Sequence, residues 1–218
     1  MSQAAAPARR IVILIGLLLS VVIPMTGLGR LALRIPGLPP LLGQEIFFWT
    51  MAGIVLLYVR VIERRPLASI GLQRPTWKTL AFGVAGAVGV FVLGGLTVAF
   101  VLPLLHLKQD PGTVKRYLDM PYWIRFAIVT RAAICEEILM RGYGIERLQE
   151  LTGSKLVAGF VTLGLFSLGH WTYGTVAQVL MAGAAGLALT ILYIWRRDLG
   201  ANMIAHWIVD GSSLLLTP

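Results

Sequence analysis

Long apolar stretches, separated by short polar segments, run through almost the whole chain. Seven of them can be read from the sequence: Ile11–Gly27, Glu45–Ile62, Thr79–Leu105, Tyr122–Met140, Leu156–His170, Val176–Trp195 and Ala201–Leu216. A helix of about 20 apolar residues is long enough to cross the hydrocarbon core of a bilayer. The pattern therefore predicts an all-α protein, a polytopic transmembrane helix bundle of about seven spans.

The composition agrees with this prediction and limits the domain organisation. Hydrophobic residues make up 57% of the 218 residues, charged residues only 13%, and the mean hydropathy is +0.79. Soluble domains carry about twice that share of charged residues. Because the predicted spans use most of the chain, no soluble domain fits beside them. We predict a single membrane domain over residues 1–218.

The net charge is +9. The distribution of the basic residues along the chain indicates a membrane topology and not a nucleic-acid partner. Most basic residues fall into four clusters, at Arg9–Arg10, Arg60–Lys78, Arg141–Lys155 and Arg196–Arg197. These clusters share one side if seven spans alternate across the bilayer. The positive-inside rule then places the amino terminus in the cytoplasm and the carboxyl terminus outside. We expect an integral protein of a prokaryotic cell membrane, with the lipid bilayer as a partner.

Several local features have ordinary structural interpretations. The first apolar stretch could be a signal peptide, but no cleavage site follows it convincingly, so a retained helix is favoured. Cys135 is the only cysteine, which excludes an intramolecular disulfide, and a small buried apolar residue is a better interpretation than a nucleophile. The glycines from Gly83 to Gly95 predict a helix-packing face. Ile35–Pro40 predicts the first outer turn.

Ionisable side chains inside the apolar stretches are the candidate functional residues, because charges at bilayer depth are costly and rare outside functional sites. Glu136, Glu137 and Arg141 lie in the fourth stretch. Glu137 and Arg141 are four residues apart and can pair on one helix face. Glu136 lies about 100° round the helix. We predict that it is unpaired, partly desolvated and available as a base, the alternative being a buried charge cluster that fixes helix packing.

Two histidines also lie in apolar stretches. His170 follows Phe166 by four residues, so the aromatic ring can orient the imidazole on one helix face. His206 precedes Asp210 by four residues, and a carboxylate at that spacing can fix the imidazole tautomer. Both have structural alternatives: His170 can line a helix contact, and His206 with Asp210 can supply hydrogen bonds between helices.

The order Glu-Glu-x-x-x-Arg, Phe-x-x-x-His, His-x-x-x-Asp resembles the CPBP family of intramembrane proteases. This family includes the type II CAAX prenyl endopeptidases and bacteriocin self-immunity proteins. The matching residues are Glu136, Glu137, Arg141, Phe166, His170, His206 and Asp210. The segment Leu67–Leu72 before the third stretch is also similar to the family. The resemblance covers roughly Glu63 to Ser212, the expected catalytic core of the domain.

The resemblance implies hydrolysis of a peptide bond in a membrane-associated substrate, which a lipid modification could anchor. Glu136 and His170 would activate a water molecule, His206 and position 210 would face the carbonyl oxygen, and Phe166 would contact the substrate. CAAX-processing members usually carry Asn where this chain has Asp210. An ionised Asp cannot donate a hydrogen bond, so Asp210 is either protonated or only orients His206.

The need for a metal is open at this point. Glu136, His170 and His206 match a catalytic zinc ligand set, but they come from three helices and lack the His-Glu-x-x-His spacing. We favour a metal-free water activated by glutamate, with zinc as the alternative. A different class of function would use the same buried charges in a catalytically silent scaffold or regulator, or in a proton relay or transporter.

The depth of His170 poses a geometric problem. At 1.5 Å per residue, Glu136 and His206 come out roughly 10 Å from the cytoplasmic side, whereas His170 comes out nearer the opposite side. We therefore expect the fourth and fifth helices to extend into the cytoplasm and Trp171–Gly174 to turn back inside the protein.

Overall fold

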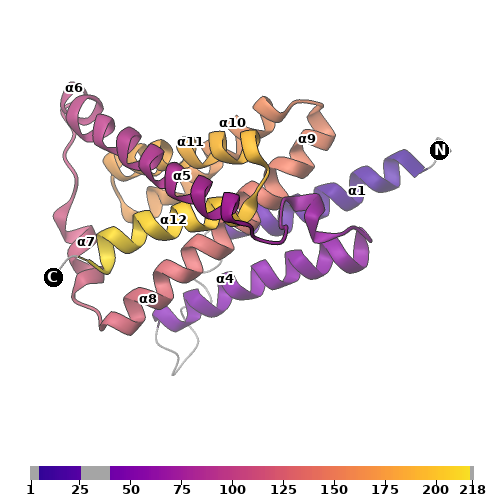
Figure 1. Ribbon diagram of the computed structural model, residues 1–218, viewed down its shortest axis with the longest axis horizontal. Coiled ribbons are helices and arrows are strands. Elements are labelled where there is room, and N and C mark those ends of the chain that lie inside the picture. Colours follow the sequence, from indigo (N-terminus) through magenta and orange to yellow (C-terminus); the bar gives the residue numbers. More distant parts are fainter. Residues whose placement is uncertain (1–4, 26–39, 217–218) are drawn as a thin grey trace.

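The computed structural model describes residues 5–25 and 40–216, and their regular structure is entirely helical (Figure 1). In chain order the elements are α1 (Ala5–Leu17), η1 (Leu18–Val22), α2 (Ile23–Met25), α4 (Pro40–Leu57), η2 (Tyr58–Ile62), η3 (Leu67–Ile70), α5 (Trp77–Leu96), η4 (Thr97–Val101), α6 (Leu102–Leu104), α7 (Pro111–Leu118), α8 (Tyr122–Arg131), η5 (Ala132–Ile145), α9 (Glu146–Thr152), α10 (Lys155–Gly169), η6 (His170–Tyr173), α11 (Val176–Arg196) and α12 (Leu199–Leu214). Each predicted apolar stretch is helical where it is described, except for Leu105, Leu215 and Leu216 at the ends of two stretches. Of the predicted turn Ile35–Pro40, only Pro40 is described.

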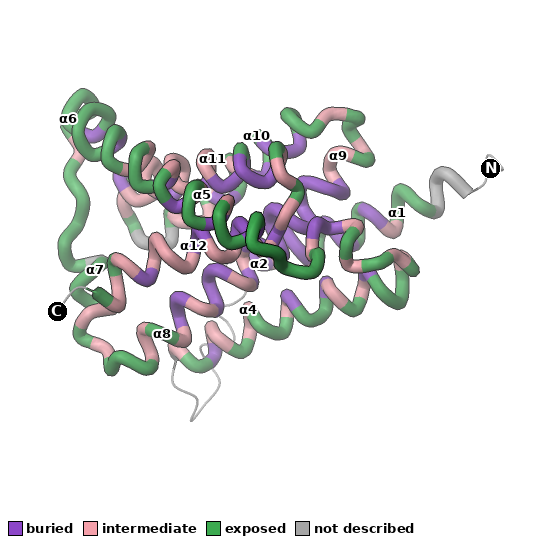
Figure 2. The backbone as a smooth tube through the Cα atoms, viewed as in Figure 1, coloured by how far each residue is buried: buried purple, intermediate pink, exposed green. Residues whose placement is uncertain are grey.

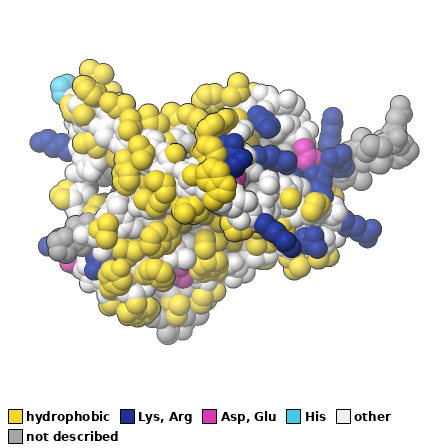
Figure 3. Space-filling model, viewed as in Figure 1, with side chains coloured by type: hydrophobic (Ala, Val, Ile, Leu, Met, Phe, Trp, Pro, Cys, Tyr) yellow, Lys and Arg dark blue, Asp and Glu magenta, His cyan; other side chains and the backbone are white. Residues whose placement is uncertain are grey.

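The outer surface of the bundle is apolar, as a membrane protein requires. Within the described ranges, three helices are long and apolar enough to cross a membrane: Leu41–Ile62, Trp77–Leu104 and Val176–Arg196. Lys155–Gly169 is a shorter apolar helix. Figure 3 shows hydrophobic side chains over much of the visible face, away from the end where α1 begins. So much exposed apolar surface favours lipid over water, and the predicted all-α membrane bundle is confirmed.

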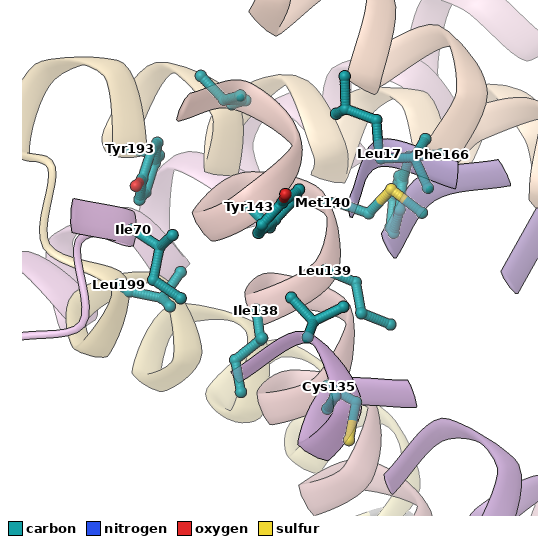
Figure 4. Packing of buried hydrophobic residues seen from close by; sticks show 14 of the residues in the cluster. Leu17, Ile70, Cys135, Ile138, Leu139, Met140, Tyr143, Phe166, Tyr193 and Leu199 are labelled. Atoms are coloured by element: carbon teal, nitrogen blue, oxygen red, sulfur yellow. The ribbon is translucent and has the colours of Figure 1, made fainter. Parts of the chain in front are cut away.

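A continuous helix runs from Tyr122 to Thr152, and its central part packs against α4, α10 and α12 (Figure 1). Its central segment, η5, has 12 buried residues among 14, and Figure 2 shows this segment buried at the centre of the bundle. Apolar side chains on this segment, including Met140 and Tyr143, form much of the core (Figure 4). Cys135 is fully buried among them, as expected of a small apolar residue.

Helices α5 and α12 pack against each other extensively, and small residues permit this approach. A Cβ atom at Gly83 would come within 2.6 Å of the Ile204 side chain, and one at Gly86 within 2.6 Å of Leu192 on α11. The predicted packing face is therefore confirmed at these two positions. The contact fixes α12, the helix that carries His206.

Ion pairs gather at one end of the bundle. Arg147, 1% exposed, binds Glu63 at 2.6 Å and Glu150 at 3.2 Å, and Arg65 also pairs with Glu150. The remaining pairs are Arg9–Glu150 at 2.8 Å and Arg197–Glu146 at 2.7 Å. Figure 3 shows basic side chains collected at the end where α1 begins. One arginine from each predicted basic cluster therefore lies on the same side, but Arg141 was wrongly counted with them, because it is buried in the core.

Candidate functional site

Glu137 lies at the centre of a buried polar cluster. Its side chain is fully buried and binds Arg141 at 2.9 Å, so the predicted ion pair is confirmed. The same Oε1 atom lies 3.0 Å from Nδ1 of His206 on α12. The side-chain amide of Asn202 donates to the other carboxylate oxygen, Oε2, at 3.2 Å. A buried carboxylate with three polar partners is held in one orientation, as a buried charge requires.

Helix α12 presents three polar residues to the site at four-residue intervals: Asn202, His206 and Asp210. Asn202 is fully buried and also donates to the carbonyl of Leu189 on α11 at 2.7 Å. The sequence interpretation missed Asn202. Its spacing from His206 was the signal, because residues four apart on a helix share a face.

His206 lies between two carboxylates. Its Nε2 atom is 3.4 Å from Oδ2 of Asp210, so the predicted His206–Asp210 pair is confirmed. Its Nδ1 atom faces Glu137. A neutral imidazole has one N–H, and only the charged form donates from both nitrogens. The geometry therefore fits an imidazolium ring that donates toward Glu137 on one side and toward Asp210 on the other.

The prediction that Glu136 is unpaired is wrong. Nη1 of Arg131 binds Oε1 of Glu136 at 3.0 Å, while Nε of the same guanidinium binds Glu45 on α4 at 3.1 Å. The prediction assumed α-helical geometry, in which residues five apart point in different directions. The η5 segment is instead a π-helix, whose hydrogen bonds join residues five apart, and this wider turn brings Arg131 to Glu136. The prediction that Glu136 is partly desolvated is confirmed, since its side chain is 16% exposed.

Phe166 and His170 reach the site from α10 and η6. Their ring centroids are 4.7 Å apart, which confirms that they share a face, and Nδ1 of His170 lies 2.9 Å from the Phe166 carbonyl oxygen. The Arg141 guanidinium stacks 4.2 Å over the Phe166 ring. Phe166 is only 4% exposed and belongs to the hydrophobic core.

Three positively charged or titratable side chains lie near Asp210. His206 contacts it directly, and both His170 and Arg131 lie within electrostatic range of its carboxylate. Arg131 in turn holds Glu136. Groups from α8, η5, η6 and α12 thus converge, although they are far apart in sequence.

The turn that brings His170 here differs from the prediction. The chain does turn at Trp171–Gly174, where Gly174 adopts a left-handed conformation with φ of 85°. The expectation that the turn lies inside the protein is wrong, because Trp171 is 56% exposed. The helix that carries Glu136 does continue beyond Met140, as far as Thr152.

The predicted metal ligands do not form a metal site. Among the described residues, no group of three His, Cys, Asp or Glu side chains is placed to hold an ion, so Glu136, His170 and His206 do not act together as a ligand set. Both nitrogens of His206 already face carboxylates. The prediction of a metalloprotease is therefore not supported, and the metal-free activation of water stays a prediction.

The fold and the site define a helical membrane protein with carboxylates, arginines and imidazoles enclosed by its helices. Residues 118–212 match the model of a protein family described as type II CAAX prenyl endopeptidase Rce1-like. The resemblance to CPBP intramembrane proteases is thereby confirmed over this segment, which contains all seven motif residues. No curated protein and no solved structure matches the chain.

Proposed function

We propose that this protein is an intramembrane endopeptidase that hydrolyses a peptide bond of a membrane-associated peptide or protein, a lipidated one included. The observation that carries the proposal is that His206 contacts Asp210, while His170 and Arg131, the partner of Glu136, lie within electrostatic range of the same carboxylate. Ionisable groups are costly inside a membrane protein and mark functional sites there. The family match, which spans all of these residues, supports proteolysis as the function.

Glu136 is the proposed general base. Its carboxylate is the less buried of the two adjacent glutamates, and it has one arginine partner, whereas Glu137 has three partners. In the proposed reaction Glu136, assisted by His170, takes a proton from water as the water oxygen attacks the carbonyl carbon. The proton then passes to the leaving nitrogen as the peptide bond breaks. Such proton transfer contributes typically 10²–10⁴-fold to the rate.

His206 is the proposed hydrogen-bond donor to the oxyanion. Glu137 anchors the ring through Nδ1, so that Nε2 is directed toward Asp210. The Nε2–Oδ2 distance of 3.4 Å is longer than a good hydrogen bond, so a developing oxyanion can compete for this N–H. We propose that Asp210 is an ionised acceptor that orients His206. A donor of this kind is worth about 3–4 kcal/mol in the transition state.

A catalytically silent scaffold is the second candidate. The specific observation in its favour is the pairing of Glu136 with Arg131, because a base that is held in an ion pair is less available for chemistry. A proton relay along Glu137, His206 and Asp210 would use the same contacts.

A cleavage assay on purified protein tests the proposal. The substrates are a prenylated CAAX peptide, the unmodified peptide and a single-span membrane peptide. We expect wild type to cleave at least one of them, and Glu136→Gln to cut the rate by at least about 100-fold in protein that remains folded. Glu150→Gln, in the ion pairs at the far end of the bundle, is the matched control and keeps the rate. Cleavage by folded Glu136→Gln within a few-fold of wild type would contradict the mechanism.

A further inference from the structure

The Arg131 side chain joins two carboxylates from different parts of the chain. It binds Glu136 at 3.0 Å and Glu45, 86 residues away on α4, at 3.1 Å. The exposed fractions of the three side chains are 6% for Arg131, 14% for Glu45 and 16% for Glu136. The guanidinium also lies 4.8 Å from the ring centre of Phe48, one helical turn after Glu45. We define Glu45, Arg131 and Glu136 as the Arg131 clamp.

We propose that Glu45 and Arg131 are positioning residues that hold the Glu136 carboxylate in the site, and this proposal rests on the proposed function. Glu45 lies outside the segment that matches the family, residues 118–212. The clamp therefore makes α4 part of the active site, although α4 carries none of the family-like motif residues.

The charge balance of the clamp explains why both carboxylates are needed. Arg131 alone, paired only with Glu136, would fully compensate the negative charge on which a base depends. Glu45 shares the same guanidinium and so reduces the hold of Arg131 on Glu136. Asp210 on α12 is also within electrostatic range of Arg131. One arginine thus orients Glu136 while its positive charge is divided among several carboxylates.

The positions of the two arginine nitrogens support a role in orientation. A guanidinium is planar and presents donors in a fixed fork, so binding Glu45 through Nε fixes the direction of Nη1 toward Glu136. The contact with Phe48 restricts the same plane. One oxygen of Glu45, Oε2, is buried and has no hydrogen-bond partner among the described residues, so Arg131 is the observed anchor of that side chain.

Kinetics on the full-length protein test the positioning role. Misplacement of a reacting group by about 1 Å can cost roughly 100-fold, so we expect Glu45→Gln and Arg131→Gln to lower kcat by about 10- to 100-fold, with KM within about threefold. Arg131→Lys keeps the charge but not the fork and should recover part of the kcat lost in Arg131→Gln. Arg125→Gln is the matched control on the same helix, because Arg125 binds the Leu214 carbonyl, and should keep kcat. Unchanged kcat in both Glu45→Gln and Arg131→Gln would overturn the positioning role.

A double-mutant cycle in melting temperature tests the clamp without an activity readout. Residues in direct contact give non-additive effects, whereas distant residues add. We expect the destabilisation in Glu45→Gln/Arg131→Gln to be smaller than the sum of the single effects, and Glu45→Gln/Arg125→Gln to be additive. Additive effects for Glu45 and Arg131 would overturn the clamp. An inactive wild type would contradict the proposed function but not the Arg131 clamp. The double-mutant cycle in melting temperature would still test the clamp.

Discussion

Glu136 and Glu137 are adjacent and chemically identical, yet the fold gives them different surroundings. Glu137 is fully buried and held by Arg141, His206 and Asn202. Glu136 keeps 16% of its side chain exposed and pairs with Arg131 alone among the contacts described. Two carboxylates in different environments can take different tasks in one reaction. Glu137 is the buried member of the pair, and Glu136 is the more exposed one.

Replacing Asp210 with Asn tests the role of the acid next to His206. If Asp210 is an ionised acceptor for Nε2, as we propose, the amide removes the charge that stabilises and orients the imidazolium. Asp210→Asn should then lower the cleavage rate at every pH. The measurement is the rate against pH for wild type and variant, with melting temperatures to confirm folding.

The opposite result would identify a different role for Asp210. A protonated Asp210 that donates to the oxyanion would lose activity as its proton dissociates, so wild type would slow at high pH. Asn is a permanent donor of similar shape. A variant that keeps the wild-type rate and lacks the high-pH loss would therefore contradict the acceptor role.

Among the elements, the π-helix η5 shapes the site most. It covers Ala132–Ile145 and carries both glutamates and Arg141. Segments of π-helix are rare and occur often at functional sites. Here the wider turn brings Arg131 to Glu136, five residues on, while Glu137 still reaches Arg141, four residues on. One helix can thereby provide two arginine–glutamate pairs.

Removing Arg141 should destabilise the packing of η5 against α10 and α11. Arg141 binds Glu137, stacks on Phe166 and donates to the carbonyl of Gly186 at 3.3 Å. Loss of one partner leaves a buried charge uncompensated, at a cost of about 3–5 kcal/mol. We expect Arg141→Ala to lower the melting temperature and the activity together. If the variant melts like wild type but is inactive, Arg141 acts on the substrate instead.

At the scale of the whole molecule, the ends of the bundle differ in charge. Helix α1 begins near one end of the longest axis and α12 ends near the other (Figure 1). The end near α1 holds the ion pairs that join α1, α9 and the loop before η3. Burial by itself would raise the pKa of Glu150, but the hydrogen bond and charge of Arg65, with Arg147, lower that pKa below its ordinary value of 4.5.

These ion pairs predict a loss of stability in acid. A carboxylate whose pKa is lowered by folding stabilises the protein above its ordinary pKa, and this contribution disappears as the pH falls through the lowered value. We expect the melting temperature of wild type to decrease as the pH is lowered below about 4.5. Glu150→Gln lacks the ion pairs, so its melting temperature at pH 7 should be lower than that of wild type. It also has no carboxyl to protonate at this position, so its melting temperature should decrease less in acid. Identical pH profiles for the two proteins would show that Glu150 does not contribute.

Contacts within single helices were predictable, because helix periodicity fixes which residues share a face. The pairs Glu137–Arg141, Phe166–His170 and His206–Asp210 are four residues apart and are observed. The apolar stretches were predictable for a similar reason, since a span must be long and apolar to cross a bilayer. The failure at Glu136 has a local cause: apolar patterning does not distinguish an α-helix from a π-helix, and the pairing with Arg131 depends on that difference.

The helical membrane class, most helix boundaries and the seven motif residues of the candidate site could be predicted from the sequence, whereas Asn202, Arg131 and Glu45 were not predicted. Only the tertiary structure decided which of these residues meet. Glu137 and His206 are 69 residues apart, and Glu45 and Arg131 are 86 apart. Such contacts depend on how helices are rotated and packed against one another, and side-chain packing throughout the bundle sets that arrangement. The different surroundings of Glu136 and Glu137 therefore result from the tertiary structure and cannot be read from the motif.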